Sequence, residues 1–173
     1  VTIVCAVLLA TIVAHYDEFL PYRWHTFKAT DGSFTAQFPS NPKVNETQVR
    51  LVAGGTTTLD QITAKPQRNT VYTFSYFDDP RLANGPAEKA LNSARDGSVS
   101  RLQGTVISDH DLEVDGYPAL DVEIRARADS LVAERLIAVR HRMLLLVVVE
   151  TDRTRPDSKN IQRFFDSIKI SPQ

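Results

Sequence analysis

Val132-Ala-Glu-Arg-Leu-Ile-Ala-Val-Arg140 and Met143-Leu-Leu-Leu-Val-Val-Val-Glu150 are the two stretches of sequence that decide the fold. Both are rich in β-branched and aliphatic residues, and both have the length of a strand. Residues 143–149 are apolar at every position, which is typical of a strand that is covered on both faces. The dipeptide His141-Arg142 between the two stretches is a candidate turn.

Further strands are predicted on either side of this pair by short alternating runs bounded by turn residues. Two runs flank Asp31-Gly32, where the glycine provides the positive φ that a tight hairpin turn needs. A second hairpin is expected around Gly54-Gly55, and a third turn at Asp115-Gly116. The predicted strands are Trp24–Ala29, Ser33–Phe38, Thr47–Val52, Thr56–Ala64, Val71–Phe77, Thr105–Leu112 and Tyr117–Ala128.

Two helices are predicted, and they complete the fold class. Apolar residues at helical spacing indicate one helix at Ala87–Leu102, with Pro86 at its beginning and Gly104 at its end. Ile161, Phe164 and Phe165 share one face of a second helix at Ser158–Phe165. Many strands with few helices indicate an α+β fold, a mostly antiparallel β-sheet flanked by helices.

The N-terminal residues 1–14 form an apolar run without charge, followed by His15 and Asp17. The run is short for a membrane span, and it suits a membrane anchor, the remnant of a signal peptide or a buried helix. Tyr22 and Trp24 follow closely, and such rings favour a membrane interface, so we expect an anchor. We therefore expect residues 15–23 to be a linker and residues 24–170 to be one α+β domain outside the cytoplasm, or secreted if the leader is cleaved.

The composition excludes several classes of protein. The 173 residues carry 20 basic and 21 acidic side chains, so no excess of positive charge favours nucleic acid as a partner. The single cysteine lies in the apolar run, which leaves the rest of the chain without a disulfide framework or a cysteine cluster for zinc. We expect no cofactor.

Several phrases of the sequence together resemble a known family. They are Gly32-Ser-Phe-Thr-Ala-Gln-Phe-Pro39, Tyr76-Phe-Asp-Asp-Pro80, Ala90-Leu-Asn-Ser-Ala-Arg-Asp-Gly97, Asp115-Gly-Tyr-Pro-Ala119 and Arg163-Phe-Phe-Asp-Ser-Ile-Lys169. This resembles uncharacterised bacterial proteins, frequent in planctomycete-like genomes, in which an anchor or signal segment precedes one domain. More distantly it is similar to the PsbP/Mog1 fold, an antiparallel sheet sandwiched by helices. The resemblance implies adaptor or assembly roles without a shared catalytic site.

The end of the strand at Val71–Phe77, beside the following helix, is the candidate binding site. Tyr76 and Asp78 end the strand, and Arg95 and Asp96 lie on the helix. Strand ends beside helices are favoured positions for pockets, so we expect a ligand to bind there. The alternative is structural, with an ion pair between Arg95 and Asp78 that ties the helix to the strand.

The segment Asp109-His-Asp-Leu-Glu-Val-Asp115 is the densest group of carboxylates. Its alternating acids mimic the opening of a calcium loop, but Val122 stands where the closing glutamate belongs. An edge strand and hairpin with an acidic solvent face explains it better, so we expect no metal site. Five arginines on the later strands form either a basic stripe or pairs with acids on neighbouring strands, namely Arg125, Arg127, Arg135, Arg140 and Arg142.

No catalytic motif is present, so the sequence favours a non-catalytic domain, membrane-tethered or exported, that binds a partner protein or a small ligand. One alternative is a hydrolase or metal-assisted enzyme that uses the carboxylates of Asp109–Asp115 with a histidine. Another alternative is a structural envelope protein whose edge strand pairs with a neighbour.

Overall fold

The computed structural model describes residues 22–50, 56–67, 69–127, 130–151 and 158–171. The apolar run of residues 1–14 and the predicted turn at Gly54-Gly55 lie outside the described residues.

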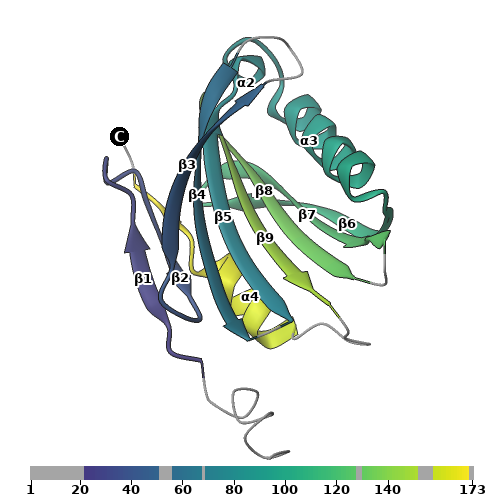
Figure 1. Cartoon of the computed structure of the whole chain (residues 1–173). Helices are drawn as coiled ribbons and strands as arrows, with labels where there is room; N and C mark the ends of the chain where they lie inside the picture. The colour runs from purple at the N-terminus through teal and green to yellow at the C-terminus, as the bar shows by residue number, and fades with distance from the viewer. Residues whose placement is uncertain (1–21, 51–55, 68, 128–129, 152–157, 172–173) are drawn as a thin grey trace, which may run out of the picture.

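Seven antiparallel strands form one strongly curved sheet, in the order β3-β4-β5-β9-β8-β7-β6 (Figure 1). Their bounds are β3 Lys43–Arg50, β4 Thr56–Gln67, β5 Thr70–Asp78, β6 Thr105–Val114, β7 Tyr117–Arg125, β8 Leu131–Val139 and β9 Arg142–Glu150. A second sheet has the order β1-β2-β10, with β1 at His25–Lys28, β2 at Phe34–Phe38 and β10 at Lys169–Ile170. The molecule is therefore α+β and mostly antiparallel, as the sequence predicts.

Helices cover both faces of the large sheet (Figure 1). Helix α3, Ala87–Leu102, packs on β7 and β8 on one face, while α4, Ser158–Asp166, lies on the other face beside the small sheet. The first helix has its predicted bounds, and the second is one residue longer than predicted. A further short helix, α2 at Pro80–Asn84, was not predicted; Asp79 caps it by accepting a hydrogen bond from the Arg81 amide.

Strand β9 lies between β5 and β8 and contributes to both halves of the core. Leu144, Leu146 and Val148 are buried towards α4 and the small sheet, with Tyr72 and Phe164. Met143 is buried on the opposite face, under α3. The prediction that this strand is covered on both faces is confirmed.

Two of the predicted turns differ in detail from the prediction, and a third agrees with it. The turn after β8 is at Arg140-His141, with a φ of 57° at Arg140, and Arg142 already belongs to β9. At the end of α3 the left-handed residue is Gln103. Gly104 is needed for a different reason, because a Cβ there would lie 2.7 Å from the Arg125 carbonyl oxygen. Asp115 and Gly116 both have positive φ, which is the hairpin turn that the Asp-Gly pair predicts.

Tyr22 and Trp24 contact the protein core rather than providing rings free for a membrane interface. The Tyr22 ring packs edge-on against Tyr72 with 6.3 Å between the centroids, and Arg163 of α4 lies 4.2 Å over the Trp24 ring. Their position in the sequence is thus explained by packing, and it lends no support to the anchor.

Candidate functional site

The four residues of the candidate binding site belong to two separate networks. Arg95 of α3 forms ion pairs with Asp96 at 2.9 Å and with Asp109 of β6 at 2.8 Å. Asp78 at the end of β5 forms an ion pair with Arg142 at 3.1 Å, and its Oδ1 lies 3.5 Å from the His141 Nε2. The predicted ion pair between Arg95 and Asp78 is therefore wrong.

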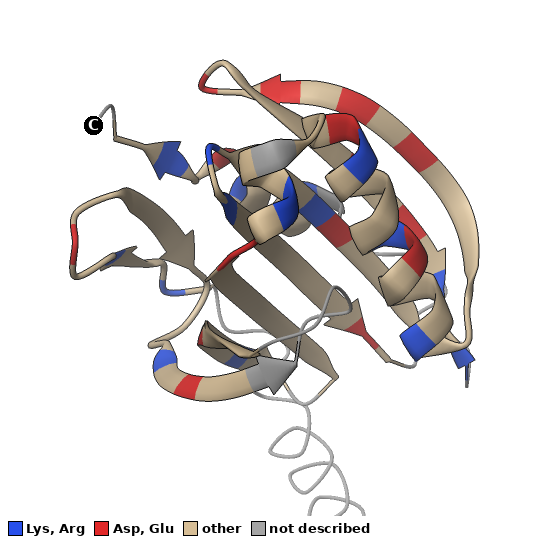
Figure 2. Ribbon diagram, turned by 90° about the horizontal axis from the view of Figure 1, so that it is seen from above, with Lys and Arg blue, Asp and Glu red and all other residues tan. Residues whose placement is uncertain are grey.

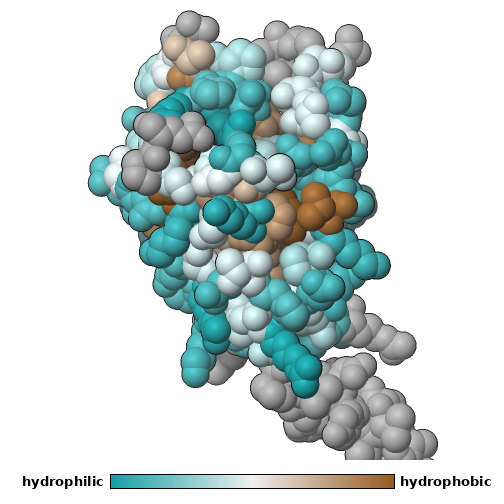
Figure 3. All heavy atoms as spheres, turned by 90° about the vertical axis from the view of Figure 1, so that its left-hand side faces the viewer, coloured by the Kyte–Doolittle hydropathy of each residue, from teal (hydrophilic) through white to brown (hydrophobic). Residues whose placement is uncertain are grey.

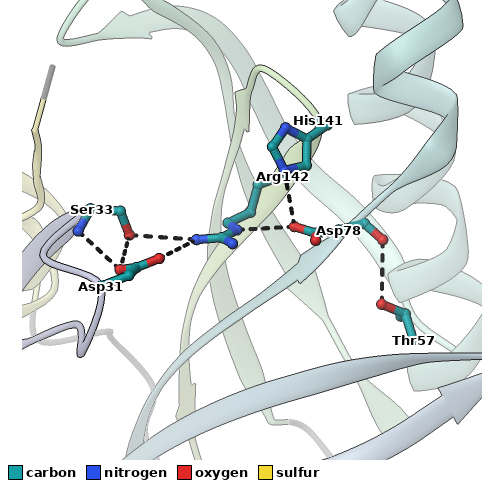
Figure 4. Close-up of polar contacts among 6 residues, drawn as sticks. All are labelled: Asp31, Ser33, Thr57, Asp78, His141 and Arg142. Atoms are coloured by element: carbon teal, nitrogen blue, oxygen red, sulfur yellow. Dashed lines mark hydrogen bonds and ion pairs between the residues drawn. The ribbon is translucent and has the colours of Figure 1, made fainter. Parts of the chain in front are cut away.

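Asp78 belongs to a cluster around Arg142, the first residue of β9 (Figure 4), and the Tyr76 ring contacts the same arginine. The Arg142 Nε donates to Asp78, and its Nη1 donates to Asp31 at 3.0 Å, in the turn between β1 and β2. The guanidinium carbon lies 5.4 Å from the centroid of the Tyr76 ring. One arginine thus links the small sheet to the large one.

The electrostatics of this cluster indicate a structural clamp. Hydrogen bonds from the Ser33 side chain and amide, with help from Arg142, lower the pKa of Asp31 to about 2. Burial, together with the neighbouring Asp60 carboxylate, raises the pKa of Tyr76 to about 12. Because Arg142 already donates to two carboxylates of its own chain, its guanidinium is committed to holding the sheets together.

A hollow, which we call the α4 groove, lies between α4 and strands β6 to β8 and has a volume of about 180 Å³. Its apolar part is formed by Ala133, Ile161 and Phe165. The polar side chains along it come from several elements, and they include Ser108, His110, Glu123 and Gln162. The groove combines an apolar floor with polar walls, which is the usual make-up of a binding site.

Arg135 closes one side of this groove, where it contacts two of the lining residues, Asp121 and Phe165. It donates from Nε and Nη2 to the two Asp121 oxygens, at 2.7 and 2.8 Å, and from Nη1 to Asp166 at 3.1 Å. Its guanidinium carbon lies 5.0 Å from the centroid of the Phe165 ring. The Arg135 side chain is only 5% exposed, and its charge is paired with carboxylates of the protein itself.

The interpretation of the arginines as partners of acids on neighbouring strands is confirmed at this position, since Asp121 and Arg135 are paired residues of β7 and β8. The basic stripe does not form, because Arg142 belongs to the clamp and Arg127 donates to Gln103 at 2.6 Å. Asp121 and Asp166 are paired with Arg135, and Arg125 lies on the same face of β7 beyond Glu123. The residues that line the groove include Asp121 and Glu123 but no lysine or arginine.

The carboxylates of Asp109–Asp115 lie on β6 and in the hairpin that follows it. Figure 2 shows acidic residues recurring along this outermost strand, and the register places Asp109, Asp111 and Glu113 on alternate positions. Asp109 pairs with Arg95, and Asp115 accepts a hydrogen bond from the Ile170 amide at 2.9 Å. The interpretation as an edge strand and hairpin is confirmed. Among the residues that the structure describes, no group of three or more His, Cys, Asp or Glu is placed to hold a metal ion.

A buried carboxylic acid, Glu134 of β8, lies on the other face of the sheet, under α3. Its neighbours across the strands are Val122 and Val147, and it is 4% exposed. Burial raises the pKa of Glu134, against the opposing influence of the hydrogen bond from Ser98 and the charge of Arg101. Its Oε2 atom has no hydrogen-bond partner among the described residues.

Sequence reasoning missed the α4 groove because its walls come from α4 and three strands. The alternation of β6 places Ser108 and His110 on one face, but nothing in the sequence indicates that α4 packs over that face.

Comparison with solved structures supports the fold. Cyanobacterial PsbP (CyanoP) from Synechocystis is similar with a TM-score of 0.56 and 10% sequence identity, over 88% of this chain and 94% of that one. PA94, a protein of unknown function from Pseudomonas aeruginosa, is similar with a TM-score of 0.50 and 14% identity, over 87% and 99% of the two chains. No protein-family model and no curated protein matches the sequence. The chain thus has a PsbP-like fold, and the likeness concerns the fold alone.

Proposed function

We propose that this protein is a binding domain without catalytic activity, and that it takes a partner protein or a small ligand in the α4 groove. The observation that carries the proposal is the apolar floor of Ala133, Ile161 and Phe165 beside an acidic wall. The one buried arginine next to the groove, Arg135, is engaged by two carboxylates of the chain, which favours a structural role over a catalytic one.

The charges around the groove determine the kind of ligand. The groove lining contains Asp121 and Glu123 and no lysine or arginine, and the nearby Asp166 side chain, which pairs with Arg135, is 58% exposed. A ligand that combines an apolar ring or side chain with a positive charge fits this arrangement. The proposed ligand is therefore a cationic amphipathic group.

We test the proposal with benzamidine, which is cationic, and benzoate, which has a similar ring and a negative charge. Each is titrated into the ¹⁵N-labelled chain, and backbone amide shifts are recorded. Benzamidine is expected to shift the amides of Ser108, His110, Glu123 and Gln162, and benzoate is expected to leave them unchanged.

Matched variants place a tryptophan in the groove or on the opposite edge of the sheet. Ser108→Trp fills the groove and is expected to abolish the benzamidine shifts, while Thr47→Trp on exposed β3 retains them. Shifts confined to other surfaces, or equal responses to both compounds, would contradict the proposal. Turnover of a substrate that is lost on changing Asp111 or His110 would favour the hydrolase alternative.

We also propose that the domain is tethered to a membrane or exported, on the basis of the apolar residues 1–14. Among the described residues, no helix is long and apolar enough to cross a membrane. Expression of the gene in a bacterial host, followed by fractionation and N-terminal sequencing, separates the outcomes. Membrane retention with the run intact supports a tether, a soluble exported product that begins near His15 supports cleavage, and an uncleaved cytoplasmic product would contradict both.

A further inference from the structure

We propose that the partner presents a basic extended segment, which adds to the large sheet as a strand beside β6. This inference rests on the proposed function and names the class of partner. It combines the outer edge of β6, its exposed apolar residues and the acidic side chains that alternate along it.

Strand β6 is an open edge, since it pairs only with β7 among the described strands. Most of its residues are exposed, and they include two large apolar side chains, Val106 at 41% and Ile107 at 46%. An open edge offers unpaired backbone N–H and C=O groups, which an extended segment satisfies by pairing. Val106 and Ile107 provide apolar contact at the beginning of the strand.

The charges along this edge are acidic on the face of α3. Asp109, Asp111 and Glu113 alternate along β6 on the face of α3, where Arg95 is paired with the first of them. On the face of α4, Asp121 and Glu123 of β7 line the groove beside Ser108 and His110 of β6. A strand added beside β6 thus has the acidic residues of β6 as direct neighbours on the face of α3, and Ser108 and His110 on the face of α4.

This distribution selects a basic partner over a second copy of the chain. Two β6 strands placed edge to edge would bring acidic side chains opposite each other, which is destabilising. A segment that carries Lys or Arg instead gains favourable pairs with Asp111 and Glu113 on the face of α3. Residues on the groove side of the added strand also reach the site of the proposed cationic ligand.

The test uses a synthetic peptide in which Lys or Arg alternates with Val, titrated against the full chain and followed by fluorescence anisotropy. An otherwise identical peptide with Glu in place of the basic residues tests charge. A third peptide carries N-methyl groups on alternate residues and is made in both registers, at the odd or at the even positions. It keeps the side chains and loses the backbone N–H donors. We expect binding of the basic peptide alone.

Protein variants localise the binding to one edge. The double variant Asp111→Lys with Glu113→Lys is expected to lower the affinity for the basic peptide about tenfold. Glu46→Lys on exposed β3 is expected to change that affinity by less than about twofold. Equal binding of the acidic or the N-methylated peptide would overturn the inference, as would a dimer formed through β6 in sedimentation. If benzamidine binds the groove while the basic peptide does not bind, the proposed function stands and this inference fails.

Discussion

Replacement of Glu134 by methionine is expected to stabilise the protein at neutral pH. The side chain is 4% exposed between Val122 and Val147, and its Oε2 atom has no hydrogen-bond partner among the described residues. An unsatisfied buried polar atom costs about 1–3 kcal/mol, and an apolar side chain of similar size removes that cost. We expect Glu134→Met to raise the free energy of unfolding by about 2 kcal/mol and Tm by about 4–8 °C at pH 7.

The direction of the pKa shift of Glu134 determines how the gain in stability of the methionine variant changes with pH. Burial raises the pKa of Glu134 above its ordinary value of 4.5, so the folded protein binds this proton more tightly than the unfolded chain does. Its contribution to stability is therefore fully present below pH 4.5 and is lost as the pH rises through the raised pKa. The advantage of the methionine variant over the wild type is expected to grow from pH 4 to pH 8.

The assay is urea unfolding of both proteins at each pH, with Glu113→Met on exposed β6 as the matched control. The control is expected to change stability by less than about 0.5 kcal/mol. An advantage of Glu134→Met that stays constant with pH, or a loss of stability at pH 7, would refute the reasoning about this carboxyl group.

Three further predictions concern other parts of the fold. Gly97→Ala, at an exposed helical position with open space around it, is expected to stabilise the protein by about 0.5–1 kcal/mol. Gly104→Ala is expected to destabilise it by more than about 1 kcal/mol, because the new Cβ would lie 2.7 Å from a carbonyl oxygen. Thermal unfolding distinguishes the two signs. Arg135→Met is expected to cost about 2 kcal/mol in urea unfolding, because it leaves the Asp121 carboxylate without its partner, and Asp121→Leu in the same chain should recover part of this loss. Asp31→Ala is expected to cost about 1 kcal/mol at pH 7, after allowance for solvent screening at a half-exposed group. This contribution is present above the ordinary pKa of 3.8 and is lost as the pH falls through about 2, so equal stability of variant and wild type at neutral pH would contradict it.

Local patterns predicted most of the secondary structure. The bounds of α3 follow from the spacing of its apolar residues, and residues 143–149 of β9 are all apolar because both faces of the sheet are covered there. Helix α2 was not predicted because its five residues, which begin with Pro80, are too few to show a helical periodicity. The two-residue strand β10 is defined by its pairing with β2, which the local sequence does not indicate.

The candidate site was harder to predict because its contacts are distant in the sequence. Arg142 and Asp31 are 111 residues apart, and nothing in either neighbourhood indicates that they meet. Arg95 paired with Asp109 instead of Asp78, because α3 packs against β7 and β8 and so lies close to β6. The pair of Asp121 and Arg135 was accessible to sequence reasoning, since it depends on the register of neighbouring strands.

The two outer strands of the large sheet, β3 and β6, differ in their surface residues, so a single measurement can distinguish binding at one edge from binding at the other. Figure 3 shows the side of the molecule that carries β1 to β3, which is mainly hydrophilic with small apolar patches. The opposite edge, β6, carries the acidic row and the exposed Val106 and Ile107.

Hydrogen–deuterium exchange of the full chain, with and without the basic alternating peptide, tests the central claim most directly. Binding beside β6 and in the α4 groove is expected to slow exchange of the amides of residues 105–114, and to leave those of residues 43–48 unchanged. Protection of the β3 edge instead, or no protection on either edge at saturating peptide, would contradict the account.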